Sequence, residues 1–281
     1  MNKNFVHVTS PFTDEDSRWM KVAINYARRN LGLTGKNPCV GCVIVNNNEL
    51  YGFGVTSLGG RPHAEENALN FVGKKSKNSV LYVTLEPCAH YERFLPCMEK
   101  IVQASIRRVV IACLDPDKRT NGKAIEFLLE RNIDVSLGCE ETNAMELIEG
   151  FTKRLIFKRP FIKTKIASSL DSKISLSNGI SKWITGPNTR KQIHLYRLRS
   201  DGLLTGVNTI NEDNPKLNCR LKGLNKFSPY VFILDSNLTI KTSSKILNKK
   251  NVSIFTTKFS NNKQIKLLRE KGINVIVVDH D

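Results

Sequence analysis

The chain has 281 residues, of which 40% are hydrophobic and 25% charged, a balance typical of a globular protein of about two domains. The formal net charge is +17, but lysine runs such as GKKSKNS lack interleaved aromatic residues, so solvated surface lysines explain it better than a nucleic-acid partner. We find no secretory signal and no apolar run near the roughly 18 residues of a membrane span, and seven scattered cysteines favour a reducing, cytoplasmic location over a disulfide framework.

The first part of the chain alternates between helical and strand patterns. Two short strands joined by an Asn-rich turn are predicted over residues 40–55. The other strands are predicted over 79–87, 107–113 and 133–138, and the helices over 16–30 (capped by its aspartate), 63–72, 97–106 and 122–132. This alternation predicts a three-layer α/β/α sandwich with a largely parallel core.

A second α/β pattern follows a boundary near residues 150 to 160. We therefore expect a first domain over 1–150, a linker over 151–160 and a second domain over 161–281. In the second domain we predict a helix and a strand within 183–210, a helix at 262–272 and strands at 230–236, 252–257 and 273–281.

His63, Cys88 and Cys97 carry the clearest chemical signal. Each cysteine directly follows a proline; Cys88 leaves a predicted strand, whereas Cys97 and His63 each open a predicted helix. Zinc prefers imidazole and thiolate ligands, and three protein ligands with one open position is the catalytic arrangement. A helix N-terminus also stabilises a thiolate. Each residue alone would be interpreted as a core or surface residue, but together they predict a zinc site.

Glu65 lies two residues beyond His63 and is not expected to bind the metal. Zinc held by one neutral imidazole and two thiolates carries no net charge, so its water needs a base, and a nearby carboxylate can take the proton and later protonate a leaving nitrogen. The H-A-E and P-C pairs match the signature of zinc nucleobase deaminases. Here, however, eight residues separate the cysteines instead of two.

The other five cysteines are not expected to bind metal. Cys39 and Cys42 form a C-x-x-C pair, but they lie in the strand-like run CVGCVIV, where successive side chains face opposite ways and core packing is favoured. Cys113 and Cys139 are also expected in the core, and Cys219 carries no interpretable signal.

Four segments in this order, NPCVGCVIV, GGRPHAEENAL, VTLEPCAHYERFLPC and DPDKRTNGKAIEFL, resemble the deaminase half of the bifunctional riboflavin-biosynthesis deaminase–reductases. That family keeps eight residues between its zinc cysteines. The resemblance covers nearly the whole chain and implies a cytidine-deaminase-like domain followed by a dihydrofolate-reductase-like α/β domain. The implied reaction is hydrolytic removal of an exocyclic amine from a phosphoribosylated diaminopyrimidinone.

The resemblance also implies roles around the deaminase site. Asn37 matches a base-contacting asparagine, and Arg93 keeps the positive charge that the family places near the substrate phosphate. Glu92 and Phe94 depart from the family's Gly and Thr, so we expect an altered substrate loop around intact metal ligands.

The stretch KIASSLDSKISLSNGISKWITG resembles the opening of the family's reductase half, which uses NADPH to reduce the ribosyl group to a ribityl chain. By position, the residues implied to line the cofactor are Ala167, Trp183, Thr209, Asp213 and Ser236. Those implied to contact the phosphorylated substrate are Ser181, Arg197, Leu217 and Arg220. Ser172 stands where the family has glycine. The family continues beyond residues 273–281 into a glycine-rich phosphate-binding segment, so we expect this half to be incomplete and to oxidise NADPH negligibly.

Three hypotheses follow from these observations. The first is a zinc deaminase of riboflavin biosynthesis, a homo-oligomer acting on a phosphorylated pyrimidine with no nucleic-acid or membrane partner. The second is a tRNA-editing deaminase, favoured by the net charge but opposed by the cysteine spacing and the lack of a basic-aromatic strip. The third is a zinc-stabilised scaffold without activity, suggested by Glu92, Phe94 and the chain end.

Overall fold

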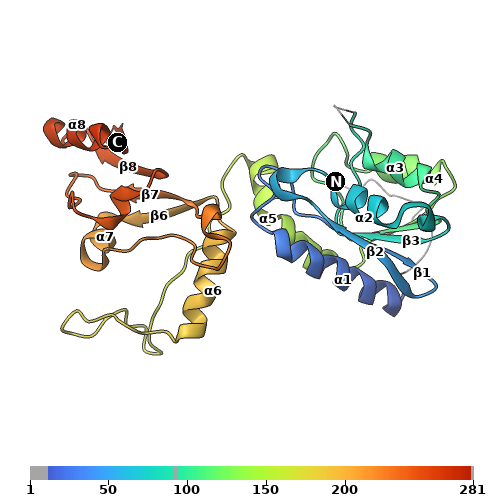
Figure 1. The fold of residues 1–281 in the computed structure, drawn as a ribbon, viewed down its shortest axis with the longest axis horizontal. Coiled ribbons are helices and arrows are strands. Elements are labelled where there is room, and N and C mark those ends of the chain that lie inside the picture. The colour runs from blue at the N-terminus through green and yellow to red at the C-terminus, as the bar shows by residue number, and fades with distance from the viewer. Residues whose placement is uncertain (1–11, 92–93, 280–281) are drawn as a thin grey trace. The chain divides into compact units, whose positions relative to one another are not determined.

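The computed structural model describes residues 12–91 and 94–279. Glu92 and Arg93, to which the sequence analysis gave roles, lie outside these residues. The chain divides into two compact units, Met1–Thr164 and Lys165–Asp281, each with its own sheet and hydrophobic core (Figure 1).

The first unit is built on a five-stranded sheet of order β2-β1-β3-β4-β5. Its strands are β1 (Gly41–Asn46), β2 (Glu49–Val55), β3 (Val80–Val83), β4 (Arg108–Ile111) and β5 (Asp134–Leu137). The predicted hairpin is confirmed, with β1 antiparallel to β2. The expectation of a largely parallel core is wrong: β1 is antiparallel to β3 as well, and only the β3-β4 and β4-β5 pairs are parallel. The chain runs from β2 through α2 before it enters β3, so β3 runs in the direction of β2 and opposite to β1.

Helices cover both faces of this sheet, which confirms the predicted three layers (Figure 1). One layer holds α1 (Asp14–Asn30) and α5 (Glu141–Phe157), and the other holds α2 (Ala64–Val72), α3 (Cys97–Gln103) and α4 (Lys123–Leu129), with 3-10 turns η1 (Leu58–Gly60) and η2 (Gly73–Ser76) around α2. Because α5 continues to Phe157, most of the 151–160 segment expected as a linker is helical.

Helix α1 is capped by Thr13 and not, as expected, by Asp16. Thr13 accepts a hydrogen bond from the amide of Asp16, and the Asp16 carboxylate accepts one from the amide of Thr13, so the two form a capping box. Asp16 is buried and also accepts bonds from Tyr82 on β3 and Arg108 on β4. The Asp16 carboxylate therefore completes the capping box around Thr13 and fixes the helix to two strands.

Two glycines let helices approach the β1-β2 hairpin. A Cβ atom at Gly41 would lie 2.0 Å from the carbonyl oxygen of Ala23 on α1, and one at Gly54 would lie 2.0 Å from that of Ala64 on α2. Both clashes are with backbone atoms, which cannot move aside as a flexible side chain can. Because Gly54 has no side chain, the first turn of α2 can lie directly against β2. His63 and Glu65 lie at this end of the helix.

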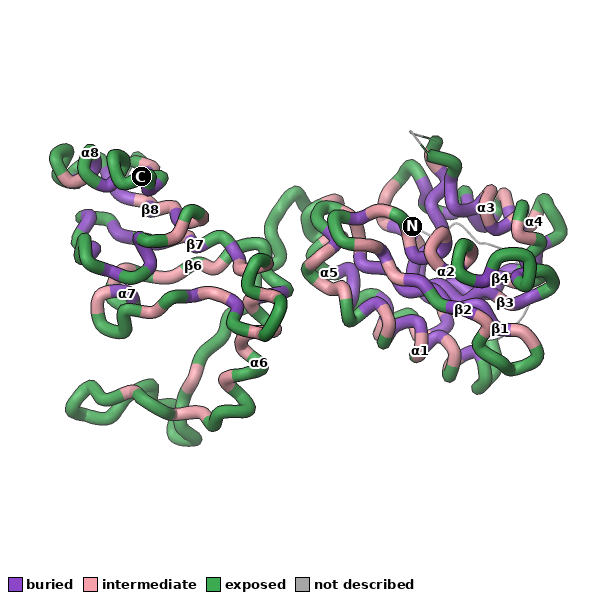
Figure 2. Tube along the Cα trace, in the orientation of Figure 1, coloured by how far each residue is buried: buried purple, intermediate pink, exposed green. Residues whose placement is uncertain are grey.

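The second unit has a parallel four-stranded sheet of order β6-β7-β8-β9. Its elements are α6 (Pro187–Leu198), β6 (Gly202–Gly206), α7 (Val207–Asp213), η3 (Asn225–Phe227), β7 (Tyr230–Leu234), η4 (Lys245–Asn248), β8 (Val252–Thr257), α8 (Asn262–Glu270) and β9 (Asn274–Val278). The predicted strands and helices are confirmed; α7, which begins where β6 ends, was not separated from the strand. Residues 165–186 are mostly exposed (Figure 2).

All seven cysteines are buried and none forms a disulfide, so the core placement expected for Cys39, Cys42, Cys113 and Cys139 is confirmed. Among the described helices, none combines the length and apolar character needed to cross a bilayer.

Candidate metal centre and active site

His63, Cys88 and Cys97 converge, although they come from three different parts of the first unit. His63 is the N-cap of α2, Cys97 is the first residue of α3, and Cys88 lies in the loop that follows β3. Their ligand atoms all lie within 4.8 Å of one another, with 3.4 Å between Cys97 Sγ and His63 Nδ1. Within the described ranges no other group of three His, Cys, Asp or Glu side chains is close enough to share a metal ion.

The electrostatics of these side chains suit a metal. Hydrogen bonds from Cys97 and His63 lower the pKa of Cys88 to about 4, and the Cys97 amide donates to its sulfur at 3.3 Å. The bond to Cys88 and burial raise the pKa of Cys97. Burial lowers the pKa of His63, but the bond to Cys88 and the charge of Glu65 outweigh it, so the net shift is upward. The lowered pKa favours the thiolate form of Cys88, which is the form of cysteine that binds a metal. One nitrogen and two sulfurs form a donor set that fits zinc.

Glu65 is buried in the first turn of α2, beside this cluster, with only 3% of its surface exposed. Burial raises the pKa of its carboxyl to about 7; His63 acts in the opposite direction, and Cys88 adds to the increase. A carboxyl group that titrates near neutrality can both accept and donate a proton at physiological pH.

Phe94, three residues before Cys97, is an exposed aromatic residue. Phe94 is 53% exposed and its ring lies 4.9 Å from the guanidinium carbon of Arg61, at cation–π distance. Arg61 is two residues before His63. The loop that carries Phe94 in place of the family's threonine thus contacts the loop that leads into α2.

Asn37 has a structural contact that sequence reasoning did not identify. Its side-chain nitrogen donates to the backbone carbonyl of Gly60 at 2.9 Å, and the backbone carbonyl of Asn37 accepts from the Thr34 hydroxyl at 2.8 Å. These bonds anchor the loop that precedes His63. The role of Asn37 in contacting a base stays a prediction.

Glu86 is a second buried carboxylate, which the sequence analysis did not single out. It accepts hydrogen bonds from the amides of Asp115 (3.2 Å), Gly122 (3.0 Å) and Ala124 (3.2 Å). It thereby holds the start of α4 and the loop before it against the segment that carries Cys88. The available signal was an ionisable residue near the end of the strand predicted over 79–87, between Leu85 and Pro87.

In the second unit, three of the implied cofactor residues lie at one edge of the sheet. Thr209 and Asp213 are on α7, directly after β6, and Ser236 directly follows β7. Because β6 and β7 are parallel neighbours, their carboxyl ends meet at the same edge, where open α/β sheets bind ligands. Lys182 Nζ lies 3.5 Å from Asp213, whereas the neighbouring Trp183 is exposed and its ring lies 4.2 Å from the guanidinium carbon of Arg190.

The remaining implied residues fall into two groups, one around α6 and one in the exposed segment before it. Arg197 near the end of α6 donates to the carbonyl of Asn218 at 3.1 Å, and the Arg220 side chain contacts His194 of the same helix at 3.3 Å. Arg197, Arg220 and the buried Leu217 therefore come together. Ser181 and Ala167 lie in the mostly exposed 165–186 segment.

The fold and the cluster define a protein with a zinc-type deaminase domain followed by a second α/β domain. Residues 13–113 match the cytidine and deoxycytidylate deaminase zinc-binding region, and residues 160–281 match the RibD C-terminal domain. The chain belongs to the RibD family of riboflavin-biosynthesis proteins.

Sequence and structural relatives agree on this family. The RibD protein of Aquifex aeolicus is 39% identical over 263 residues, 94% of this chain and 74% of that protein. The Bacillus amyloliquefaciens RibD is 38% identical over 265 residues, 94% of this chain and 71% of that protein. Acinetobacter baumannii RibD (form 1) superposes with a TM-score of 0.80 at 36% identity, covering 94% of this chain and 74% of that one. The Thermotoga maritima diaminohydroxyphosphoribosylaminopyrimidine deaminase/5-amino-6-(5-phosphoribosylamino)uracil reductase gives 0.80 at 32% identity, with 95% and 81% coverage.

Proposed function

We propose that this chain hydrolytically deaminates 2,5-diamino-6-(5-phosphoribosylamino)pyrimidin-4-one, with zinc held by His63, Cys88 and Cys97 and with Glu65 as the acid–base residue. The observation that carries the proposal is the convergence of these three ligand atoms within 4.8 Å beside a buried carboxyl group. The relatives' names support this substrate.

The residues divide the chemistry between them. Zinc, when bound, supplies the Lewis acidity that activates a water molecule. Glu65 takes the proton of that water as the oxygen attacks the amidine carbon, and it then delivers the proton to the exocyclic nitrogen, which leaves as ammonia. Because Glu65 is almost fully buried, bulk water does not compete for this proton.

The second unit matches the RibD C-terminal domain, so in place of the negligible NADPH oxidation expected from the sequence, the unit is proposed to bind NADPH along the edge formed by the carboxyl ends of β6 and β7 and to reduce the ribosyl chain to ribityl. Thr209, Asp213 and Ser236 support this placement because the three follow neighbouring parallel strands. Arg197 and Arg220 are proposed to face the substrate phosphate, a group that suits guanidinium. The proposal includes a cytoplasmic homo-oligomer without a nucleic-acid or membrane partner.

An ammonia-release assay on the diaminopyrimidinone ribosyl phosphate, with and without NADPH, tests the proposal. Glu65→Gln should keep bound zinc and lose at least about a hundredfold in rate, since positioned acid–base groups contribute about 10²–10⁴-fold. The matched control is Glu66→Gln on the same helix turn: Glu66 pairs with Lys100 at 2.8 Å and should stay within a few-fold of wild type. Equal rates for Glu65→Gln and wild type, whether high or near zero, would reject the acid–base role; rates near zero would favour the scaffold hypothesis.

A further inference from the structure

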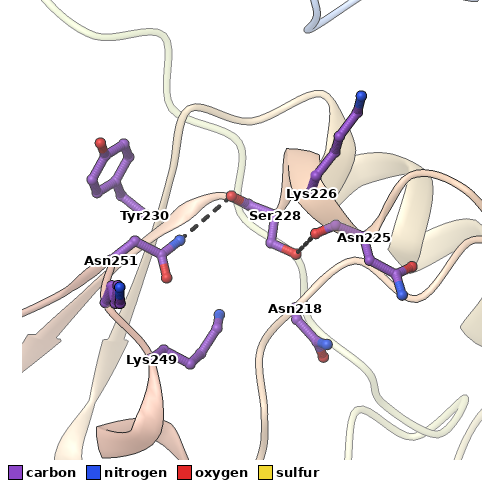
Figure 3. Close-up of a pocket in the computed structure, with 8 residues that line it drawn as sticks. Asn218, Asn225, Lys226, Ser228, Tyr230, Lys249 and Asn251 are labelled. Carbon is purple, nitrogen blue, oxygen red and sulfur yellow. Dashed lines mark hydrogen bonds between the residues drawn. The ribbon is translucent and has the colours of Figure 1, made fainter.

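A polar pocket lies in the second unit at the opposite edge of the sheet from the proposed cofactor residues. It has a volume of about 520 Å³ and is open to solvent. The segments just before β7 and β8 contribute to it, with Asn218, Lys226, Ser228, Lys249, Lys250 and Asn251 in its lining. Figure 3 shows the Lys249 side chain directed into the space between Asn218, Ser228 and Asn251.

Lys249 is the unusual residue of this pocket. Its ammonium nitrogen is buried, yet it has no hydrogen-bond partner in the part of the chain that the structure describes. Nor does any carboxylate of the described residues form an ion pair with Lys226, Lys249 or Lys250. A buried, unpaired cation is costly to a folded protein, so such groups are normally paired.

The surroundings increase this cost. Arg197, which is bound through its Nη1 to the Asn218 carbonyl, has a buried Nε that also lacks a partner among the described residues. Burial and the charge of Arg197 lower the pKa of Lys249. Lys249 of the pocket lining and the neighbouring Arg197 are thus two cations close enough to repel each other, an arrangement that an anion would stabilise.

We propose that this pocket binds the phosphate group of a small molecule, with Lys249 as its central cation. A phosphate oxygen accepts charge-assisted hydrogen bonds from an ammonium group, which removes the cost of the unpaired charge. The pocket is much larger than a phosphate ion and falls in the usual range of small-molecule sites, so a sugar phosphate fits as well as the free ion.

This site is separate from the cofactor edge, because the pocket residues precede β7 and β8 whereas Thr209 and Ser236 follow β6 and β7. Lys249 has no part in the proposed catalysis, although its neighbour Arg197 is also proposed to face the substrate phosphate. Binding can be measured without turnover, and the Lys249 variant separates this pocket from the residues proposed for the substrate.

The test is calorimetric titration of the full chain at constant ionic strength with inorganic phosphate, with ribose 5-phosphate and, as a phosphate-free control, with ribose. Both phosphate compounds should bind and ribose should not. Equal affinities would identify the phosphate alone as the recognised group, and tighter binding of ribose 5-phosphate would identify a sugar-phosphate site. Absence of binding by both would overturn the proposal.

Two variants locate the site. Lys249→Met should weaken phosphate binding by roughly tenfold or more, as expected for a lost charged hydrogen bond. Its melting temperature without phosphate should equal or exceed that of wild type, because an unpaired buried charge is removed. Lys266→Met makes the same change on the exposed face of α8 and should bind phosphate like wild type. Unchanged binding in Lys249→Met, or a fall in its stability together with binding, would contradict the assignment.

Discussion

Replacing Asp16 by asparagine should strongly destabilise the first unit. The Asp16 side chain is 2% exposed and that of Arg108 is 18% exposed, and two guanidinium nitrogens reach its oxygens at 3.1 and 3.0 Å. Tyr82 donates at 2.9 Å and the Thr13 amide at 2.8 Å. Asparagine keeps the volume but turns an amide NH₂ toward these donors and leaves Arg108 uncompensated. Removing one partner of a buried ion pair costs roughly 3–5 kcal/mol, and because Arg108 keeps some contact with water we expect about 3 kcal/mol.

The effect should depend on pH. Burial raises the pKa of Asp16, but hydrogen bonds from Thr13, Arg108 and Tyr82 outweigh it and hold the pKa below its ordinary value. The carboxylate therefore stabilises the fold above its unfolded pKa of about 3.9, and this contribution is lost as pH falls through the lower folded value. The difference between wild type and Asp16→Asn should begin to shrink as pH falls below about 5 and should keep shrinking until pH has passed the lowered folded pKa.

Urea unfolding followed by tryptophan fluorescence measures this difference. Trp19 is on α1 and partly buried, whereas Trp183 is 71% exposed, so most of the signal change should come from the first unit. Asp14→Asn, in the exposed first position of the same helix, is the matched control and should cost no more than about 0.5 kcal/mol. A loss below about 1 kcal/mol for Asp16→Asn, or a difference that does not change on acidification, would refute the reasoning.

Two further substitutions test the packing and the backbone. Gly54→Ala places a methyl group 2.0 Å from the Ala64 carbonyl oxygen and should push α2 away from the sheet, at a cost of about 1–3 kcal/mol in folding stability. The variant should also lose zinc to a chelator faster than wild type. Gly206→Ala, where a Cβ atom meets open space, should retain zinc normally, and equal retention by both variants would argue against the clash. Ser172 has a φ of +64°, so Ser172→Gly should relieve about 1 kcal/mol of strain. The amide of Ser169, bonded to the Lys173 carbonyl at 2.9 Å across this turn, should then exchange its proton about fivefold more slowly; faster exchange would count against a strained turn.

Periodicity predicted most of the elements because apolar residues face a single core in each unit. It failed where a tertiary contact decides the outcome. Asp16 looked like a cap, but its carboxylate is needed by Arg108, which is 92 residues away. The strand directions failed for a similar reason: a local pattern identifies β1 and β3 as strands, but their relative direction depends on the path between them.

The candidate site was predictable as a set of residue types but not as a geometry. The H-A-E and Pro-Cys pairs named the residues that the structure brings together. The position of Glu86 between Leu85 and Pro87 hinted at its burial but not at its three amide donors, and nothing in the sequence indicated that Lys249 Nζ is buried without a partner among the described residues. Ser172 lies between these cases: its replacement of glycine was visible, and the structure adds the positive φ that explains why glycine suits the position.

The central claim is that one imidazole and two thiolates bind a single zinc ion beside Glu65. X-ray absorption at the zinc edge, on protein purified without added metal, tests it most directly. The spectrum should show zinc with two sulfur neighbours at about 2.3 Å and lighter neighbours at about 2.0–2.1 Å, and metal analysis of the same sample should give one zinc per chain. Cys88→Ser should remove one sulfur or the metal altogether, whereas Cys113→Ser, a buried cysteine outside the cluster, should leave the spectrum unchanged. A chain without zinc, or zinc bound only through nitrogen and oxygen, would contradict the account.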